Sequence, residues 1–254
     1  MSFQINPAWA LAVFLMACRL AGVLLLSPVL GFATLPRRVR VIFVLLMAMV
    51  LAVPAQLSIP LQGLEPVGLA VLAGVALLQG ALVGAALRAA VAAFGFGGQL
   101  VDFQIGFNAA AILNPATEVQ SSLVGTLLET LSVLLFLLLD LHHVLLRGLA
   151  EVFRPAPLSL IQPADLTHAV LDQSALIFAG GLALVMPVVV GLFLLDLTVA
   201  ALSRSMPQIN IYFVALPLKV FAGLTLVALS VSYLVPLSSR IFGMALSSLA
   251  PQAP

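Results

Sequence analysis

Four residues between positions 129 and 147 place acids, an imidazole and a guanidinium in an otherwise apolar stretch. Glu129, Asp140, His143 and Arg147 follow one another at spacings of eleven, three and four. On one continuous helix of about 3.6 residues per turn, this spacing places all four on one face. Carboxylates and imidazoles at membrane depth can relay protons or ions, and they can equally form a polar seam that pairs within the protein or with neighbouring subunits. Both interpretations stay open here.

His142 stands next to His143, which raises the question of a metal site. Adjacent helical side chains point about 100° apart, so two consecutive histidines do not easily share one ion. Cys18 is the single cysteine and lies in an apolar run, which excludes an intramolecular disulfide and a cysteine-rich metal site. The sequence therefore predicts no metal site.

Membrane helices must position these residues. Hydrophobic residues make up 63% of the chain and charged residues 7%, against about 25% charged residues in soluble domains. No Asp, Glu, Lys or Arg occurs in residues 41–64, 66–87, 173–195 and 220–239. Each stretch can cross a hydrocarbon core of about 30 Å as a helix that rises about 1.5 Å per residue. The sequence therefore predicts an all-α polytopic membrane protein.

Six long, kinked helical segments are expected, and the first is interpreted as a retained span because no basic region precedes it. They cover approximately residues 7–30, 41–59, 66–95, 119–153, 172–204 and 211–249. The third is expected to loosen at Gly95, Gly97 and Gly98, since glycine weakens a helix. Little length remains for a separate catalytic domain.

A proline-rich stretch follows the fourth segment. Pro155, Pro157 and Pro163 each lack an amide donor and disfavour helix at the preceding residue. They predict a linker at residues 155–171 between a four-segment part, residues 1–154, and a helical hairpin, residues 172–254. No clear internal repeat relates the two parts.

Charged side chains inside these segments need partners, because a charge at the bilayer centre costs at least about 2.5 to 3.5 kcal/mol. The residues concerned are Arg19, Glu129, Asp140, His142, His143, Asp196 and Lys219. Gln208 and Asn210 add two amides between the last two segments. A turn that locks onto another subunit would satisfy these amides, and so would a solvated loop.

Residues 95–115 are apolar, rich in glycine and flanked by two predicted helices. Non-helical backbone at membrane depth is tolerated only where protein buries it or an aqueous cavity wets it. A re-entrant loop that lines or closes a pore would satisfy this rule. An ordinary interfacial turn is the alternative.

Several motifs together resemble the FliR family, the R subunits of the flagellar type III export gate, which are related to the T subunits of injectisomes. The matching stretches are Arg19, Ser27-Pro28, Leu35-Pro36-Arg37-Arg38-Val39-Arg40, Gly106-Phe107 through Asn114-Pro115, Gly180-Gly181-Leu182, Met186-Pro187, Pro207-Gln208-Ile209-Asn210-Ile211 and Pro217-Leu218-Lys219. Relatives usually carry Asp-Pro where this chain has Asn114-Pro115, so a role for that acid does not carry over. They often have glycine where Ala215 stands. Gly223 and the last stretch favour the flagellar branch.

The resemblance implies a subunit that catalyses no reaction, so no catalytic residue and no cofactor are expected. It implies a P-like first part and a Q-like hairpin, which assemble with FliP and FliQ subunits and with FlhB and FlhA. Flagellar basal-body and rod proteins, exported unfolded proteins and membrane lipid are further implied partners. The implied location is the bacterial inner membrane within the flagellar basal body, with parts of the chain at periplasmic height. The net charge of +1 offers no basic stripe for nucleic acid.

A plug segment at about residues 106–118 corresponds to the family's central loop. Its predicted gate residues are Gly106, Phe107, Ala109, Ala110, Ala111, Ile112, Leu113, Asn114 and Pro115. Small apolar side chains can pack into a dry seal, and Gly106 lets the backbone bend. Subunit interfaces are predicted at Arg19, Glu129, Asp140, Arg204, Pro207, Gln208, Asn210, Pro217 and Lys219.

The predicted function is that of a core export-gate subunit that helps to form and close a channel for unfolded flagellar proteins. An injectisome gate subunit, a scaffold that nucleates assembly, and an ion-coupled transporter using Glu129, Asp140 and His143 are the alternatives. A transporter should show inverted repeats and a polar midplane site in both halves, and the sequence shows neither.

Overall fold

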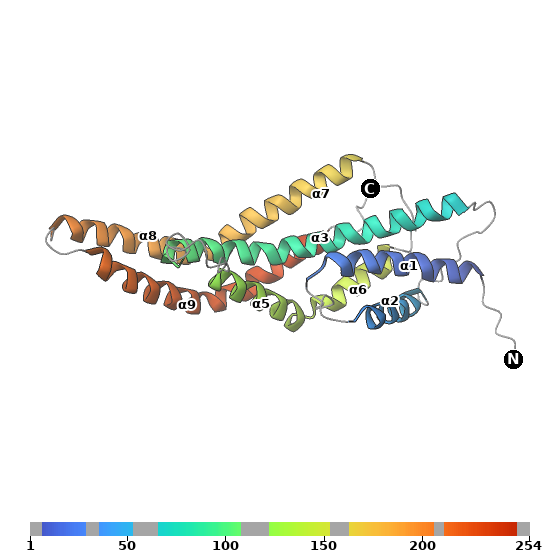
Figure 1. The fold of residues 1–254 in the computed structure, drawn as a ribbon, viewed down its shortest axis with the longest axis horizontal. Helices are drawn as coiled ribbons and strands as arrows, with labels where there is room; N and C mark the ends of the chain where they lie inside the picture. Colours follow the sequence, from blue (N-terminus) through green and yellow to red (C-terminus); the bar gives the residue numbers. More distant parts are fainter. Residues whose placement is uncertain are drawn as a thin grey trace. The chain divides into compact units, whose positions relative to one another are not determined.

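The computed structural model describes residues 7–28, 36–52, 66–107, 122–152, 163–205 and 211–247. Within these ranges every regular element is a helix (Figure 1). The elements are α1 (Pro7–Leu26), α2 (Arg37–Ala52), α3 (Pro66–Ile105), α5 (Leu123–Leu138), α6 (Leu141–Val152), α7 (Pro163–Ala175), the π-helical turn η2 (Leu176–Gly180), α8 (Gly181–Ser205) and α9 (Ile211–Ser247). The all-α prediction is confirmed.

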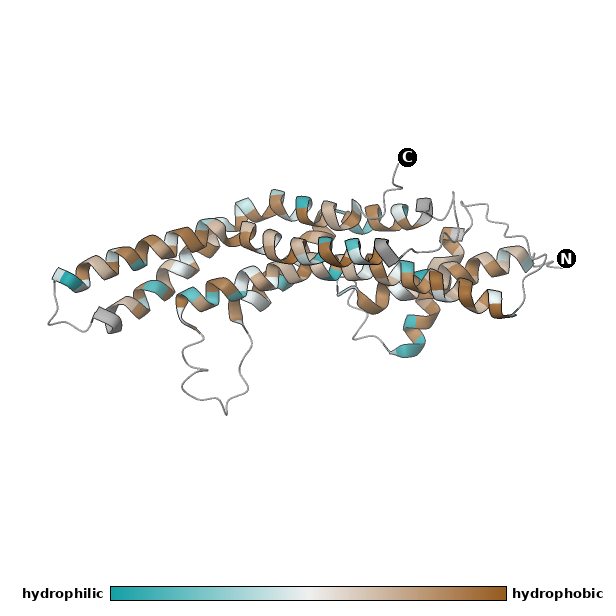
Figure 2. Cartoon of the chain, turned by 90° about the horizontal axis from the view of Figure 1, so that it is seen from above, coloured by the Kyte–Doolittle hydropathy of each residue, from teal (hydrophilic) through white to brown (hydrophobic). Residues whose placement is uncertain are grey.

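Among the described residues, four helical stretches are long and apolar enough to cross a membrane: Pro7–Leu26, Pro66–Ile105, Leu166–Ser205 and Ala215–Ser247. A fifth is added if the bent pair α5 and α6 counts as one span. Hydrophobic residues predominate along the described helices (Figure 2). Only 17% of the apolar window of Ala215–Ser247 is buried within the chain, so lipid or partner proteins must cover the remainder. The prediction of a polytopic membrane protein is confirmed.

The chain forms two compact units, each assembled from segments that are far apart in the sequence. The first unit comprises Met1–Ala89, Leu137–Gln173 and Phe242–Pro254, and the second comprises Ala90–Phe136 and Ser174–Ile241. The long helices α3 and α9 contribute to both units. The predicted division into P-like and Q-like parts in sequence order stays a prediction.

In the first unit, α1 packs against α2, and α1 and α3 run parallel and touch through glycines. A Cβ added to Gly80 would overlap the backbone carbonyl of Arg19, and one added to Gly84 would lie 2.6 Å from the carbonyl oxygen of Val23. Gly80 and Gly84 form a G-x-x-x-G pair, a spacing that lets membrane helices approach closely. The two backbones are therefore in direct contact.

In the second unit, the C-terminal part of α3 packs against α5 and α8. Gly98 of α3 meets Gly125 of α5, and a Cβ on Gly97 would lie 2.8 Å from the carbonyl oxygen of Gly181 in α8. α8 and α9 lie side by side as an antiparallel hairpin (Figure 1). Glycine again sets the distance between the helices.

Two helix boundaries differ from the prediction. α3 does not end at Gly95, Gly97 and Gly98 but continues to Ile105. Each glycine costs about 1 kcal/mol of helix propensity, and close packing against α5 and α8 offsets this cost. α7 begins at Pro163, inside the predicted linker, because proline is favoured at the first helical position, where its missing N–H would be unpaired anyway.

The long helical segment predicted over residues 119–153 is interrupted by a break. α5 ends at Leu138 and α6 begins at Leu141. Between them, Asp140 has a φ of 54°, a left-handed conformation that aspartate adopts more readily than apolar residues do. The Asp140 carbonyl then accepts the His143 N–H at 3.0 Å, which starts the new helix.

Replacing Gly80 with alanine should lower the melting midpoint of the full chain in detergent. The added methyl group would overlap the Arg19 backbone, so α1 must shift at a cost of about 1 to 3 kcal/mol. Gly74 lies in the same helix with nothing within 4 Å of an added Cβ. Gly74→Ala is therefore the matched control, and its midpoint should be unchanged or higher. Equal midpoints for the two variants would contradict the direct backbone contact.

Candidate functional site

Asp102 lies in the last turn of α3, and its side chain is fully buried. Its carboxylate accepts hydrogen bonds from the Ser122 hydroxyl and from the Val124 N–H, the latter at 3.2 Å to Oδ1 and 3.1 Å to Oδ2. Val124 belongs to the first turn of α5, where N–H groups have no acceptor within the helix. The carboxylate supplies one, and its negative charge complements the positive end of the helix dipole.

The backbone of Asp102 also ends α3. Its carbonyl accepts the N–H groups of Gly106 and Phe107, both at 3.1 Å. Gly106 has a φ of 92°, as expected for a glycine that closes a helix in the left-handed region. Asp102 therefore forms hydrogen bonds with the residues that directly follow α3 and with residues at the start of α5. It links the two ends of the segment that connects these helices.

Ser122 completes the start of α5. Its hydroxyl oxygen accepts the Gly125 N–H at 2.8 Å, and its carbonyl accepts the Thr126 N–H at 3.0 Å. This is the usual hydrogen-bonding role of a serine N-cap. Together, Asp102 and Ser122 satisfy the N–H groups of Val124, Gly125 and Thr126, which fixes the direction in which α5 starts.

A cavity of about 370 Å³ adjoins the end of α3, with Gln104 and Gly106 in its wall. Asp196 of α8 and Lys219 of α9 line the same cavity and form an ion pair. Their side chains are 41% and 23% exposed, respectively. These two charges, which the sequence left without assigned partners, thus neutralise each other across the hairpin, which lowers the cost of placing them at membrane depth.

The other predicted interface residues lie in different environments. Arg19 is buried in α1, and its guanidinium donates a hydrogen bond to Gln79 of α3. Exposed positions are occupied by Glu129, Asp140, Arg204 and Pro217. Their assignment to subunit interfaces stays a prediction, as does that of Arg19 and Lys219.

Part of the predicted site lies outside the described residues. Gly106 and Phe107 form the turn that follows α3, at the start of the predicted plug segment. The plug positions outside the described residues are Ala109, Ala110, Ala111, Ile112, Leu113, Asn114 and Pro115, and the interface positions outside them are Pro207, Gln208 and Asn210.

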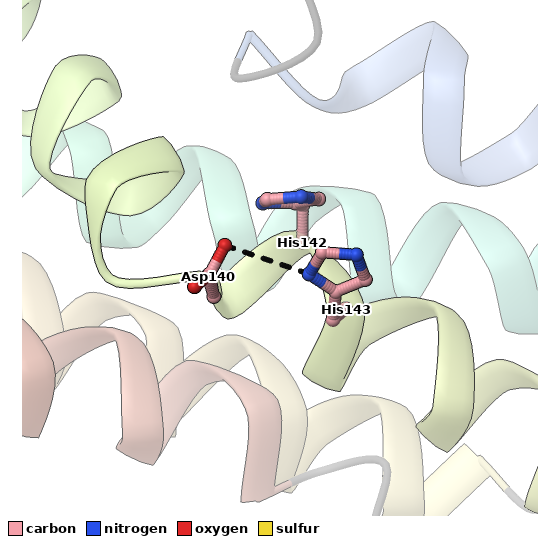
Figure 3. Close-up of side chains that lie close together, drawn as sticks. All are labelled: Asp140, His142 and His143. Carbon is pink, nitrogen blue, oxygen red and sulfur yellow. Dashed lines mark ion pairs between the residues drawn. The ribbon is translucent and has the colours of Figure 1, made fainter.

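The polar face predicted for residues 129–147 does not exist as one helical face. Glu129 belongs to α5, whereas His143 and Arg147 belong to α6, and Asp140 interrupts the helix between them. The His143 Nδ1 lies 3.6 Å from the Asp140 Oδ1 (Figure 3). The structure therefore brings Asp140 and His143 together, but the premise of a relay along one helix is wrong.

Sequence reasoning missed Asp102 and Ser122. Two local signals were present: an acid four residues before a glycine that ends a helix, and a serine immediately before an apolar helical run. Only the structure shows that the acid caps the helix that the serine begins.

The fold and these contacts define a polytopic helical membrane protein whose described polar groups cap and pair helices. Residues 10–245 match the family described as bacterial export proteins, family 1. The chain belongs to this family, and the sequence-based assignment to FliR-type proteins is confirmed.

Curated relatives agree with this assignment. The chain is 32% identical over 222 residues to the flagellar biosynthetic protein FliR of Caulobacter vibrioides, covering 86% of this chain and 87% of the relative. It is 26% identical to the FliR of Escherichia coli, covering 96% and 93% of the two chains. It is also 28% identical to the Yop proteins translocation protein T of Yersinia pestis, over 65% of each chain.

Replacing Asp102 with alanine should speed amide hydrogen exchange in the first turn of α5. The change leaves the Val124 N–H and the Ser122 hydroxyl without their acceptor, at a cost of about 1 to 3 kcal/mol for a buried donor. Asp102→Asn keeps one acceptor oxygen, so its effect should be smaller. Thr130→Ala is the control, because the Thr130 hydroxyl bonds only an exposed backbone carbonyl one turn earlier. Unchanged exchange at Val124 in Asp102→Ala would refute the capping role.

Proposed function

We propose that this chain is a core subunit of the flagellar type III protein export gate, which helps to form and close a channel for unfolded flagellar proteins. The family and the flagellar relatives support the export role. One observation supports the role in closing the channel: Asp102 forms hydrogen bonds at both ends of the segment that contains residues 108–121. A segment anchored at both ends can act as a plug without depending on its own secondary structure.

The mechanism follows from the composition of the plug segment. Residues 109–113 read Ala-Ala-Ala-Ile-Leu, which is small and apolar. Such side chains exclude water and ions when they pack together, and they separate without breaking strong polar bonds. An emerging polypeptide could therefore displace the plug at low cost, while the Asp102 contacts return it to the same place.

The proposed subunit acts as a structural component and not as an enzyme. The largely unburied apolar surface of α9 is available to lipid and to FliP- and FliQ-type partners, and FlhB and FlhA are proposed as further neighbours. The proposed location is the inner membrane within the flagellar basal body, with part of the chain at periplasmic height.

The flagellar assignment is preferred over an injectisome role. The flagellar relative from Caulobacter vibrioides is more similar to this chain and matches more of it than the Yersinia pestis T protein does. An ion-coupled transporter is disfavoured because the break at Asp140 removes the continuous polar face on which that hypothesis rested.

Deleting residues 109–113 should leave the gate complex assembled but permeable to ions. The described helices remain, so subunit contacts should persist, whereas the dry constriction is lost. Ala110→Asp is a milder test, since a carboxylate would hydrate the seal. Single-channel conductance of reconstituted complexes measures the leak, and co-purification with the partner subunits measures assembly.

Gly74→Ala, which changes an uncrowded position of α3, serves as the control and should neither leak nor impair assembly. If both plug variants assemble normally and conduct no more than the wild type, the plug assignment is wrong. If neither assembles, this segment is a subunit interface and not a plug.

A further inference from the structure

A cluster of three metal-ligand residues lies at the break between α5 and α6. One potential ligand atom from each of Asp140, His142 and His143 lies within 4.8 Å of the other two. The Asp140 carboxylate points toward the His143 ring, and the His142 ring stands beside them (Figure 3). The cluster is separate from the Asp102 contacts and plays no part in the proposed closing mechanism.

The helix break makes this cluster possible. The sequence pattern predicts that His142 and His143, as adjacent helical residues, point about 100° apart, and it places Asp140 on the same helix as both. Asp140 instead has a φ of 54° and stands just before α6, so its side chain does not follow the helical periodicity. The two imidazole rings of His142 and His143 lie with centroids 4.1 Å apart and planes tilted by 39°. Consecutive residues thus present their rings on the same side.

The donor set suits a borderline-soft divalent ion. Two imidazoles and one carboxylate bind Zn²⁺ at about 2.0 to 2.2 Å, which separates tetrahedral ligands by about 3.3 to 3.5 Å. The His143 Nδ1 and the Asp140 Oδ1 are already 3.6 Å apart. The third ligand atom lies within 4.8 Å of the other two, and water or a partner residue would complete the coordination.

An ion pair between Asp140 and His143 does not account for His142. Among the residues that the structure describes, the Nδ1 of His142 is shielded from solvent and has no hydrogen-bond partner. A buried nitrogen without a partner costs free energy that a metal ion or its bound water can offset. The side chains of Asp140 and His143 are 77% and 62% exposed, so an ion can reach the cluster.

We propose that Asp140, His142 and His143 form a binding site for a divalent transition-metal ion of the zinc type. The bound ion would tie the residue that breaks the helix to the first turn of α6. It would thereby fix the backbone at this break, in the same way that structural zinc sites stabilise short elements.

Zinc binding to the full chain tests this proposal. The protein is purified in detergent without a polyhistidine tag, stripped with a chelator, and titrated with Zn²⁺ by calorimetry, with the bound metal counted by elemental analysis. The wild type should bind one Zn²⁺ per chain and melt at a higher temperature when Zn²⁺ is present. Asp140→Asn and His143→Ala should each weaken binding by about tenfold or more and abolish the shift in melting temperature.

His168 supplies the matched control, because it is an exposed histidine of α7 and the third histidine of the chain. His168→Gln should bind Zn²⁺ as the wild type does. Asp140→Asn should fold as the wild type does, because asparagine also adopts the left-handed conformation, so a loss of binding in this variant reports the loss of the carboxylate ligand. The proposal is overturned if the wild type binds no zinc, if Asp140→Asn binds it with unchanged affinity, or if His168→Gln loses as much binding as His143→Ala.

Discussion

The buried carboxylate of Asp102 is the interaction on which the second unit depends. One residue ends α3 through its carbonyl and begins α5 through its side chain. A buried carboxylate is stable only if hydrogen bonds and helix dipoles compensate for lost water, and here both are present. Because the same residue serves both helices, the position at which the proposed plug segment leaves α3 and the position at which it enters α5 are set together.

Glycine contacts make this arrangement geometrically possible. Gly98 and Gly125 let α3 and α5 approach closely enough for the Asp102 carboxylate to reach the first turn of α5. In the first unit, Gly80 lets α1 and α3 approach closely. Membrane helices gain little from hydrophobic burial against one another, so close backbone packing and buried polar pairs carry their specificity. The partly exposed Asp196–Lys219 ion pair likewise joins α8 to α9 through polar side chains.

Sequence patterns predicted the helical class, the long apolar helices that contain the uncharged runs at residues 66–87, 173–195 and 220–239, and the family, because uncharged runs and short motifs are local signals. They did not predict the break at Asp140, since neither glycine nor proline marks it, nor the helical continuity of α3 through Gly95 and Gly98, which depends on helices far away in the sequence. The Asp102 cap was missed for the same reason. The Asp102 carboxylate and the Val124 N–H that it accepts are twenty-two residues apart, and only the packing of α3 on α5 brings them together.

The most direct test of this account is the ion conductance of the assembled gate carrying Asp102→Ala. This complex should form in normal yield and leak ions, because the proposed plug segment keeps its sequence but the start of α5 is no longer hydrogen-bonded to the end of α3. Asp102→Asn, which retains an acceptor oxygen, should leak less. A fully assembled Asp102→Ala gate that conducts no more than the wild type would contradict the claim that this carboxylate positions the plug.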